Sequence, residues 1–82
     1  MKQIPTEKPT FQHIRQQART RNGQRITRQD ITNLTGLSLG EVYIVDIGGY
    51  SAKSTVHQVL QAFNKVTGQR LTIDDILRAG VV

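Results

Sequence analysis

Two helix-start patterns with a glycine between them constrain the fold more than any other feature of the sequence. The segments T-R-Q-D (27–30) and S-L-G-E (38–41) both match the capping box. In this motif a side-chain hydroxyl accepts a hydrogen bond from a free helix amide, and the carboxylate three residues on accepts one from the cap residue's own amide. Gly36 lies where the first helix must end, because glycine adopts the left-handed conformation without strain. The pattern predicts two short helices, 28–35 and 39–47, joined by a tight turn.

The apolar residues of this stretch are expected to face one another and a shared core: Ile31, Leu34, Leu37, Val42 and Val45. The β-branched residues of VYIVDI (42–47) would also suit a strand. The capping box before that segment and Gly48-Gly49 after it favour a helix. The stretch is therefore interpreted as a helix-turn-helix unit.

Further helices are expected on both sides of this unit. A first helix runs from about Phe11 to Arg21, with an apolar stripe at helical spacing, and Asn22-Gly23 ends it. A longer helix runs from about Ala52 or Thr55 to Val66 and ends at Thr67-Gly68, with an apolar face made of Val56, Val59, Leu60, Phe63 and Val66.

The last expected element is a short helix that Thr72 and Asp75 open with a third capping pattern. Its inward residues are expected to be Ile73, Ile76 and Leu77, and Gly80 is expected to end it. The predicted fold class is all-α, a compact bundle of about five short helices.

Length and composition limit the chain of 82 residues to one small domain. Segment 1–9 is polar and proline-broken and is expected to be a flexible basic arm, with the domain at 10–82. The chain has no cysteine, which excludes disulfides and thiolate zinc sites. No apolar run reaches the length of a membrane span or a signal peptide core, so a cytoplasmic protein without membrane contact is expected.

Positive charge is concentrated in the first third of the chain, although the net charge of +5 is modest. Residues 1–28 contain seven lysines and arginines and one glutamate, so they carry +6, whereas residues 29–82 carry −1. This asymmetry suits a polyanion such as DNA, because neutralising phosphates releases condensed counterions. A solvated surface that keeps a small protein soluble would look the same, and charge alone does not decide between them.

No group of residues indicates an enzyme. The sequence offers no nucleophile–base arrangement and no phosphate loop, and the preference of acidic side chains for a helix start explains Asp74-Asp75. His13 and His57 have no cysteine or carboxylate at ligand spacing, so no metal is expected. We predict no catalytic residue, no cofactor and no small-molecule substrate.

Within residues 27–48 a series of positions follows a known pattern without a gap: Thr27, Ile31-Thr32, Gly36-Leu37-Ser38, Val42 and Asp46-x-Gly48. The segment V-x-x-A-F-N-K-V-T-G (59–68) extends the match. Over residues 11–77 the chain thus resembles the lambda repressor/Cro-like, or XRE-type, helix-turn-helix domains. Their pattern reads Ser or Thr, Leu-Ala, Gly-Val-Ser, Ile and Glu-x-Gly. Thr32 departs from it by replacing the small alanine.

The resemblance implies a DNA-binding transcriptional regulator of a bacterium, plasmid or phage. Helix 39–47 would enter the major groove of double-stranded DNA, and Arg28 and Lys53 would contact phosphates on either side. One such module contacts few base pairs, so tight site-specific binding would require a homodimer on a two-fold site. Family members usually carry Gln, Arg, Asn, Ser or Thr on the outward side of this helix, and here the outward positions offer few such groups.

The candidate DNA-binding residues are Thr27, Arg28, Gln29, Ser38, Leu39, Gly40, Glu41, Tyr43, Ile44 and Lys53. Arg28 suits a phosphate or a guanine, and Lys53, in the loop before the fourth helix, suits a phosphate. Either side chain could instead be solvated. Ser38 and Glu41 are explained first as caps, although Ser38 could also contact a phosphate and Glu41 a cytosine amine.

The remaining basic residues of the first helix and its exit, Arg15, Arg19, Arg21 and Arg25, are expected on a solvated surface, where they add long-range attraction or nothing. Asp46 takes the place of a family glutamate with a structural role and is left out of the site.

Two functions remain open for the surface of helix 39–47. Gly40 suits either close approach to DNA or an undemanding surface position. Tyr43 could contact a phosphate, a thymine methyl group or another protomer, or be an ordinary half-buried tyrosine. If Leu39 and Ile44 are exposed beside it, the three form a small apolar patch. That patch suits a protein partner as well as thymine, so the alternative function is a protein–protein interaction module.

Overall fold

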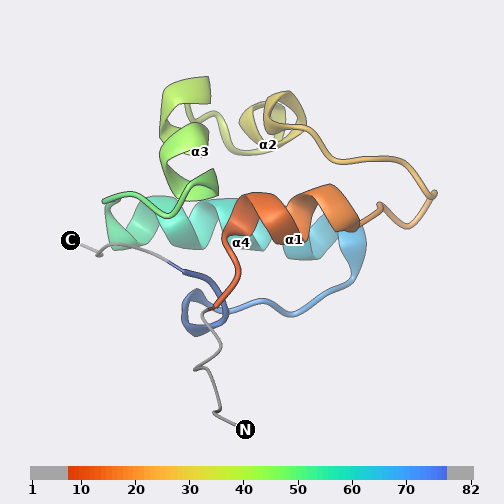
Figure 1. Cartoon of the computed structure of the whole chain (residues 1–82). Helices are drawn as coiled ribbons and strands as arrows, with labels where there is room; N and C mark the ends of the chain where they lie inside the picture. The colour runs from red at the N-terminus through yellow and green to blue at the C-terminus, as the bar shows by residue number, and fades with distance from the viewer. Residues whose placement is uncertain (1–7, 78–82) are drawn as a thin grey trace, which may run out of the picture.

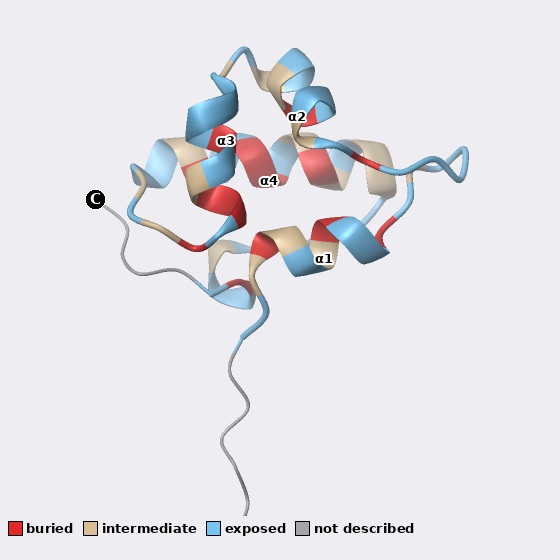
Figure 2. Cartoon of the chain, turned by 45° about the horizontal axis from the view of Figure 1, so that its top comes forward, coloured by how far each residue is buried: buried red, intermediate tan, exposed pale blue. Residues whose placement is uncertain are grey.

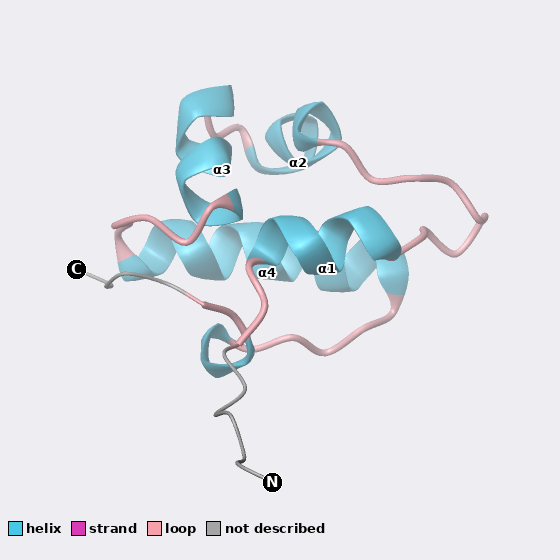
Figure 3. Ribbon diagram, viewed as in Figure 1, coloured by secondary structure: helices cyan, strands magenta, loops and turns pink. Residues whose placement is uncertain are grey.

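The computed structural model describes residues 8–77, which form four α-helices and one 3-10 helix (Figure 1). These are α1 (Phe11–Gln17), α2 (Arg28–Thr35), α3 (Leu39–Asp46), α4 (Lys53–Thr67) and η1 (Ile73–Asp75). No strand occurs between residues 8 and 77, so the all-α class is confirmed there and VYIVDI is helical up to Asp46 (Figure 3). None of these helices has the length and apolar character needed to cross a membrane.

The predicted caps of α2 and α3 are confirmed. Thr27 Oγ1 accepts from the Asp30 amide at 3.1 Å and Asp30 Oδ2 accepts from the Thr27 amide at 2.9 Å. Ser38 and Glu41 repeat this exchange at 3.1 and 2.9 Å. Gly36 ends α2 with φ 79°, a left-handed conformation that favours glycine. The two helices therefore begin and end where local sequence chemistry places their ends.

A single apolar core joins the helices. The long helix α4 packs against α2, α3 and η1, and α1 packs against α3. Figure 2 shows buried residues on the sides of these helices that face one another. Phe11 and Phe63 meet edge to face with ring centroids 5.2 Å apart. The buried apolar residues are Phe11, Ala18, Ile26, Ile31, Val42, Val45, Val56, Val59, Leu60, Phe63 and Ile76.

Leu34 is not part of that core, contrary to its prediction, and is 51% exposed. The inward side of the short helix α2 is defined by Ile31, which is fully buried, and by the partly buried Arg28, Thr32 and Thr35. These positions follow the i, i+3, i+4, i+7 rule, and Leu34 lies to one side of them. It lines a surface hollow of about 270 Å³ instead.

Helix α1 is shorter than predicted and ends at Gln17 rather than near Arg21. Ala18 has extended backbone angles, and the Arg21 amide donates to the Val66 carbonyl at the end of α4 at 3.0 Å. A helix continuing through Arg21 would have used that amide internally. The tertiary contact with α4 therefore replaces the last turn of the helix.

The C-terminal prediction is partly confirmed. Thr72 and Asp75 form the predicted capping box, but the helix they open is the single 3-10 turn η1. The chain is extended at Ile76, so successive side chains point to opposite sides: Ile76 is buried and Leu77, predicted inward, is exposed. The Leu77 amide donates to the Pro9 carbonyl at 2.8 Å, which ties the end of the predicted arm to the fold. The predicted arm residues 1–7 and the predicted stop at Gly80 lie outside the described residues.

Candidate nucleic-acid interface

The outward face of α3 consists of Leu39, Gly40, Tyr43 and Ile47, the last being the C-cap residue. Val42 and Val45 turn the opposite side of the helix into the core, which leaves these four exposed. Leu39 is 49% exposed, and Tyr43 and Ile47 are each 44% exposed. Tyr50, in the loop that follows, is also largely exposed.

Ile44 does not complete the apolar patch as predicted. It is half-buried and lies against the loop after the helix, so close to Gly49 that a Cβ there would be 3.0 Å from Ile44 Cγ2. Ile47 takes its place, because it lies one helical turn after Tyr43 on the exposed side. The sequence analysis did not name Ile47 among the outward residues, although its spacing of four residues from Tyr43 was a signal that could have found it.

Ser38 and Glu41 have their side chains committed to the cap of α3. Ser38 Oγ accepts from the Glu41 amide, and Glu41 Oε1 accepts from the Ser38 amide. Thr27 is likewise committed to the cap of α2, and Gln29 donates to Asn33 Oδ1 at 2.9 Å on the exposed side of α2. The side chains of these four candidate residues therefore already have hydrogen-bond partners within the chain.

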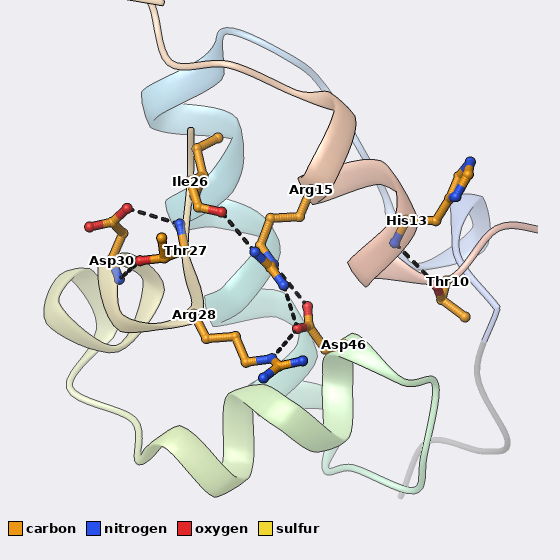
Figure 4. A network of polar contacts seen from close by, with 8 residues as sticks. All are labelled: Thr10, His13, Arg15, Ile26, Thr27, Arg28, Asp30 and Asp46. Carbon is orange, nitrogen blue, oxygen red and sulfur yellow. Dashed lines mark hydrogen bonds and ion pairs between the residues drawn. The ribbon is translucent and has the colours of Figure 1, made fainter. Parts of the chain in front are cut away.

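Arg28 takes part in a network that the sequence did not predict (Figure 4). Arg28 Nε donates to Asp46 Oδ2 at 2.6 Å, and Arg15 Nη2 donates to the same oxygen at 2.8 Å. Arg15 Nε donates to Asp46 Oδ1 at 3.1 Å, and Arg15 Nη1 to the Ile26 carbonyl at 2.8 Å. One fully buried carboxylate thus connects α1, the start of α2 and the end of α3.

This network corrects the prediction for Arg15, which is buried rather than solvated. A sequence signal existed for both members of the pair. Arg15 follows the core residue Phe11 by four positions, and Asp46 follows Val42 by four. A charged residue on an apolar helical stripe needs a buried partner, because an unpaired charge in a core is very costly. Arg19, by contrast, is exposed and bonds the Ala18 carbonyl at 2.8 Å.

The guanidinium of Arg28 also covers the aromatic ring of Tyr43, with 4.9 Å from Cζ to the ring centroid. This is a cation–π contact, and it holds a positive charge at one edge of the outward face of α3. Within residues 8–77, Nε is the only guanidinium atom of Arg28 that donates a hydrogen bond. The Arg28 side chain is 37% exposed, so its Nη groups are available to a ligand.

Lys53, the second predicted phosphate contact, is exposed. It is the first residue of α4 rather than a loop residue, which corrects its predicted position. Glu41 and Ile44 of α3 share a surface hollow with Tyr50, Ser51, Ala52 and Thr55, which brings the start of α4 beside α3. Lys53 is exposed, and Figure 1 shows the start of α4 following directly from the loop after α3.

No protein-family model, no curated protein sequence and no solved structure matches this chain. Among residues 8–77, no three His, Cys, Asp or Glu side chains lie close enough together to hold a metal ion. What the site can do therefore rests on its own geometry: an exposed helix face with Arg28 held over Tyr43, and an exposed lysine at the start of the next helix.

Proposed function

We propose that the protein is a DNA-binding transcriptional regulator with a lambda repressor-like helix-turn-helix domain, and that α3 enters the major groove. One observation carries the proposal: α2 and α3, joined at Gly36, present an exposed face of α3 with Arg28 held over Tyr43, and Lys53 is exposed at the start of the next helix. The major groove is about 12 Å wide and accepts an α-helix, while the phosphates run along both of its edges. Arg28 held beside the exposed helix and Lys53 at the start of the helix that follows it are the cations proposed to contact those phosphates.

The network around Asp46 supports the role of Arg28 as a phosphate contact. Two guanidiniums face one buried carboxylate, so the cluster retains one net positive charge. Asp46 also fixes the position of the Arg28 side chain, which lowers the entropy lost when a ligand binds to it. A positioned arginine with free Nη groups is suited to the fork-shaped hydrogen bonding that phosphate oxygens accept.

The start of α4 supports the role of Lys53. Ala52 provides no side-chain cap, and the first turn contains no acidic residue. A lysine at a helix start opposes the helix dipole, which favours negative charge there. An uncapped helix start that carries a lysine is unfavourable for the isolated domain. A bound phosphate would be attracted both by the free amides of the helix start and by the Lys53 ammonium group.

Fluorescence anisotropy of a labelled duplex at low and physiological salt tests this proposal. We expect binding that falls steeply with salt, because each neutralised phosphate releases counterions. Lys53→Ala should weaken binding and reduce the slope of log K against log[salt] by about 1. Lys65→Ala is the matched control, since Lys65 is an exposed lysine in the last turn of the same helix.

The absence of binding at low salt by a folded protein would overturn the proposal. Equal losses for Lys53→Ala and Lys65→Ala would show that attraction is diffuse and not directed to the α3 side. Circular dichroism of each variant confirms that the helical content is unchanged.

The exposed Leu39, Tyr43 and Ile47 side chains favour a second candidate, a protein–protein interaction module. In that case the folded protein binds no duplex. Sedimentation of the protein alone would then show an association that Leu39→Ser/Ile47→Ser abolishes.

A further inference from the structure

The outward face of α3 lacks the groups that usually read base edges by hydrogen bonding. Leu39, Gly40 and Ile47 offer only apolar surface, and Tyr43 adds one hydroxyl. Of the two carboxylates of α3, Glu41 accepts from the Ser38 amide and Asp46 accepts from Arg15 and Arg28. Paired hydrogen bonds to guanine or adenine require Arg, Lys, Asn or Gln, and none of these occurs in α3.

Apolar side chains do have one specific target in the major groove. The C5-methyl group of thymine projects there, and it is contacted by apolar protein groups. Cytosine lacks this methyl group, and the purines present hydrogen-bonding atoms at the same groove edge. A helix face of Leu39, Tyr43 and Ile47 is therefore chemically better matched to thymine than to the other three bases.

Gly40 provides an independent observation about how closely a partner approaches. A Cβ added at Gly40 would meet only Ser38 Oγ, at 3.8 Å, which is ordinary contact. Its φ is not positive, so the backbone does not require glycine either. Glycine lowers helix stability relative to alanine. The missing side chain at Gly40 therefore does not stabilise the fold. It would, however, allow a binding partner to approach the backbone of α3 closely.

Resting on the proposed function, we propose that α3 recognises thymine through its C5-methyl groups. Leu39, Tyr43 and Ile47 contact the methyl groups, and Gly40 allows the helix backbone to reach the base edges. Arg28, held over Tyr43, and Lys53 at the start of α4 bind the phosphates on either side. The positive charge that Arg28 holds at the edge of this face favours DNA over a protein partner, because it is opposite in sign to the phosphates along the groove.

Replacing thymine by deoxyuridine tests the proposal directly, because this removes the methyl group and leaves charge and base pairing unchanged. The probes are two duplexes of alternating A·T and A·U pairs with the same length and label. Removing one buried methyl contact weakens binding by about fourfold. We therefore expect the deoxyuridine duplex to bind at least about fourfold more weakly at the same salt concentration.

Leu39→Ser/Ile47→Ser should reduce the difference between the two duplexes, because it removes two of the three contacting side chains, and should keep the salt dependence of binding that the cations provide. That result would show that the protein face, and not an altered stiffness of the DNA, senses the methyl group. Leu34→Ser is the matched control, since Leu34 is an exposed leucine of α2 away from the α3 face. It should retain the full preference for thymine.

Gly40→Ala separates binding from folding. We expect its melting temperature to rise by a few degrees, because alanine favours the helix. Its affinity for the thymine duplex should nevertheless fall several-fold, because the added methyl group holds the helix away from the bases. Unchanged or tighter binding would overturn the role of Gly40.

The two proposals fail in different ways. Equal, salt-sensitive binding of the thymine and deoxyuridine duplexes would overturn thymine recognition and leave DNA binding intact. If neither duplex binds the folded protein at low salt, both proposals are wrong.

Discussion

Replacing Arg15 or Arg28 by methionine tests what determines the contribution of an ion pair to stability. Both side chains donate to Asp46 Oδ2, at 2.8 Å from Arg15 and 2.6 Å from Arg28. The Arg15 side chain is only 8% exposed, whereas that of Arg28 is 37% exposed. If distance dominated, Arg28 would contribute more, and if burial dominated, Arg15 would.

Burial should dominate. Removing one partner of a buried pair costs about 3–5 kcal/mol, because a buried charge loses its compensation. In Arg15→Met, Arg28 still faces Asp46, so we expect the lower end of that range, about 3 kcal/mol. Solvent screens the more exposed Arg28, and its pair should contribute about 1 kcal/mol or less. Arg15→Met also removes the 2.8 Å hydrogen bond from Arg15 to the Ile26 carbonyl, which further increases its cost relative to that of Arg28→Met.

Urea unfolding followed by far-UV circular dichroism measures both changes. A domain of this size is stable by roughly 4–12 kcal/mol, so a loss of about 3 kcal/mol is large. It corresponds to a fall in melting temperature of about 12–24 °C. Arg25→Met, at an exposed arginine in the loop before α2, is the control and should change stability by no more than about 0.5 kcal/mol.

Repeating both substitutions in an Asp46→Asn background isolates each pair, since the double-mutant cycle removes effects unrelated to the carboxylate. The coupling of Arg15 with Asp46 should be the larger of the two. If Arg28→Met costs as much as Arg15→Met, or couples more strongly to Asp46, the reasoning from burial is wrong.

Three further predictions concern α2. Gly36→Ala should destabilise the domain by about 1 kcal/mol in urea unfolding, because φ at this position is 79°. No atom lies within 4 Å of the added Cβ, so the loss would come from backbone strain alone. A neutral result would contradict the left-handed C-cap. Thr32→Val should stabilise by about 1 kcal/mol in the same assay, because Thr32 Oγ1 is buried without a hydrogen-bond partner within residues 8–77. Leu34→Ser should change the stability little, whereas Ile31→Ala, at a fully buried position, should lower the free energy of unfolding by about 2–5 kcal/mol. A larger loss for Leu34→Ser than for Ile31→Ala would indicate that Leu34 packs in the core after all.

Much of the fold could be predicted because the decisive contacts are local. A capping box involves residues three positions apart, so T-R-Q-D and S-L-G-E specify the starts of α2 and α3 without reference to the rest of the chain. Gly36 ends α2 for an equally local reason. The apolar face of α4 was predictable because Val56, Val59, Leu60 and Phe63 repeat at helical spacing over several turns.

The candidate site was less predictable, because its chemistry depends on how the helices are placed against one another. Sequence reasoning identified Arg28 and Tyr43 separately, and only the packing of α2 on α3 brings the guanidinium over the ring. It selected Ile44 for the exposed patch, where the loop at Gly49 covers that side chain and Ile47 is exposed instead. A helical period indicates which residues share a face, but not which edge of that face a neighbouring segment covers.

The sequence by itself determined the helical class, the three capping boxes and most of the apolar core, since each follows from interactions within one helix or one turn. Only the tertiary structure decided that α1 stops at Gln17 and that Leu34 is exposed. It alone paired Arg15 with Asp46, 31 residues away. The physical reason is range: a cap depends on atoms a few residues apart, whereas a buried ion pair depends on the relative position of two helices, which the packing of the entire core sets.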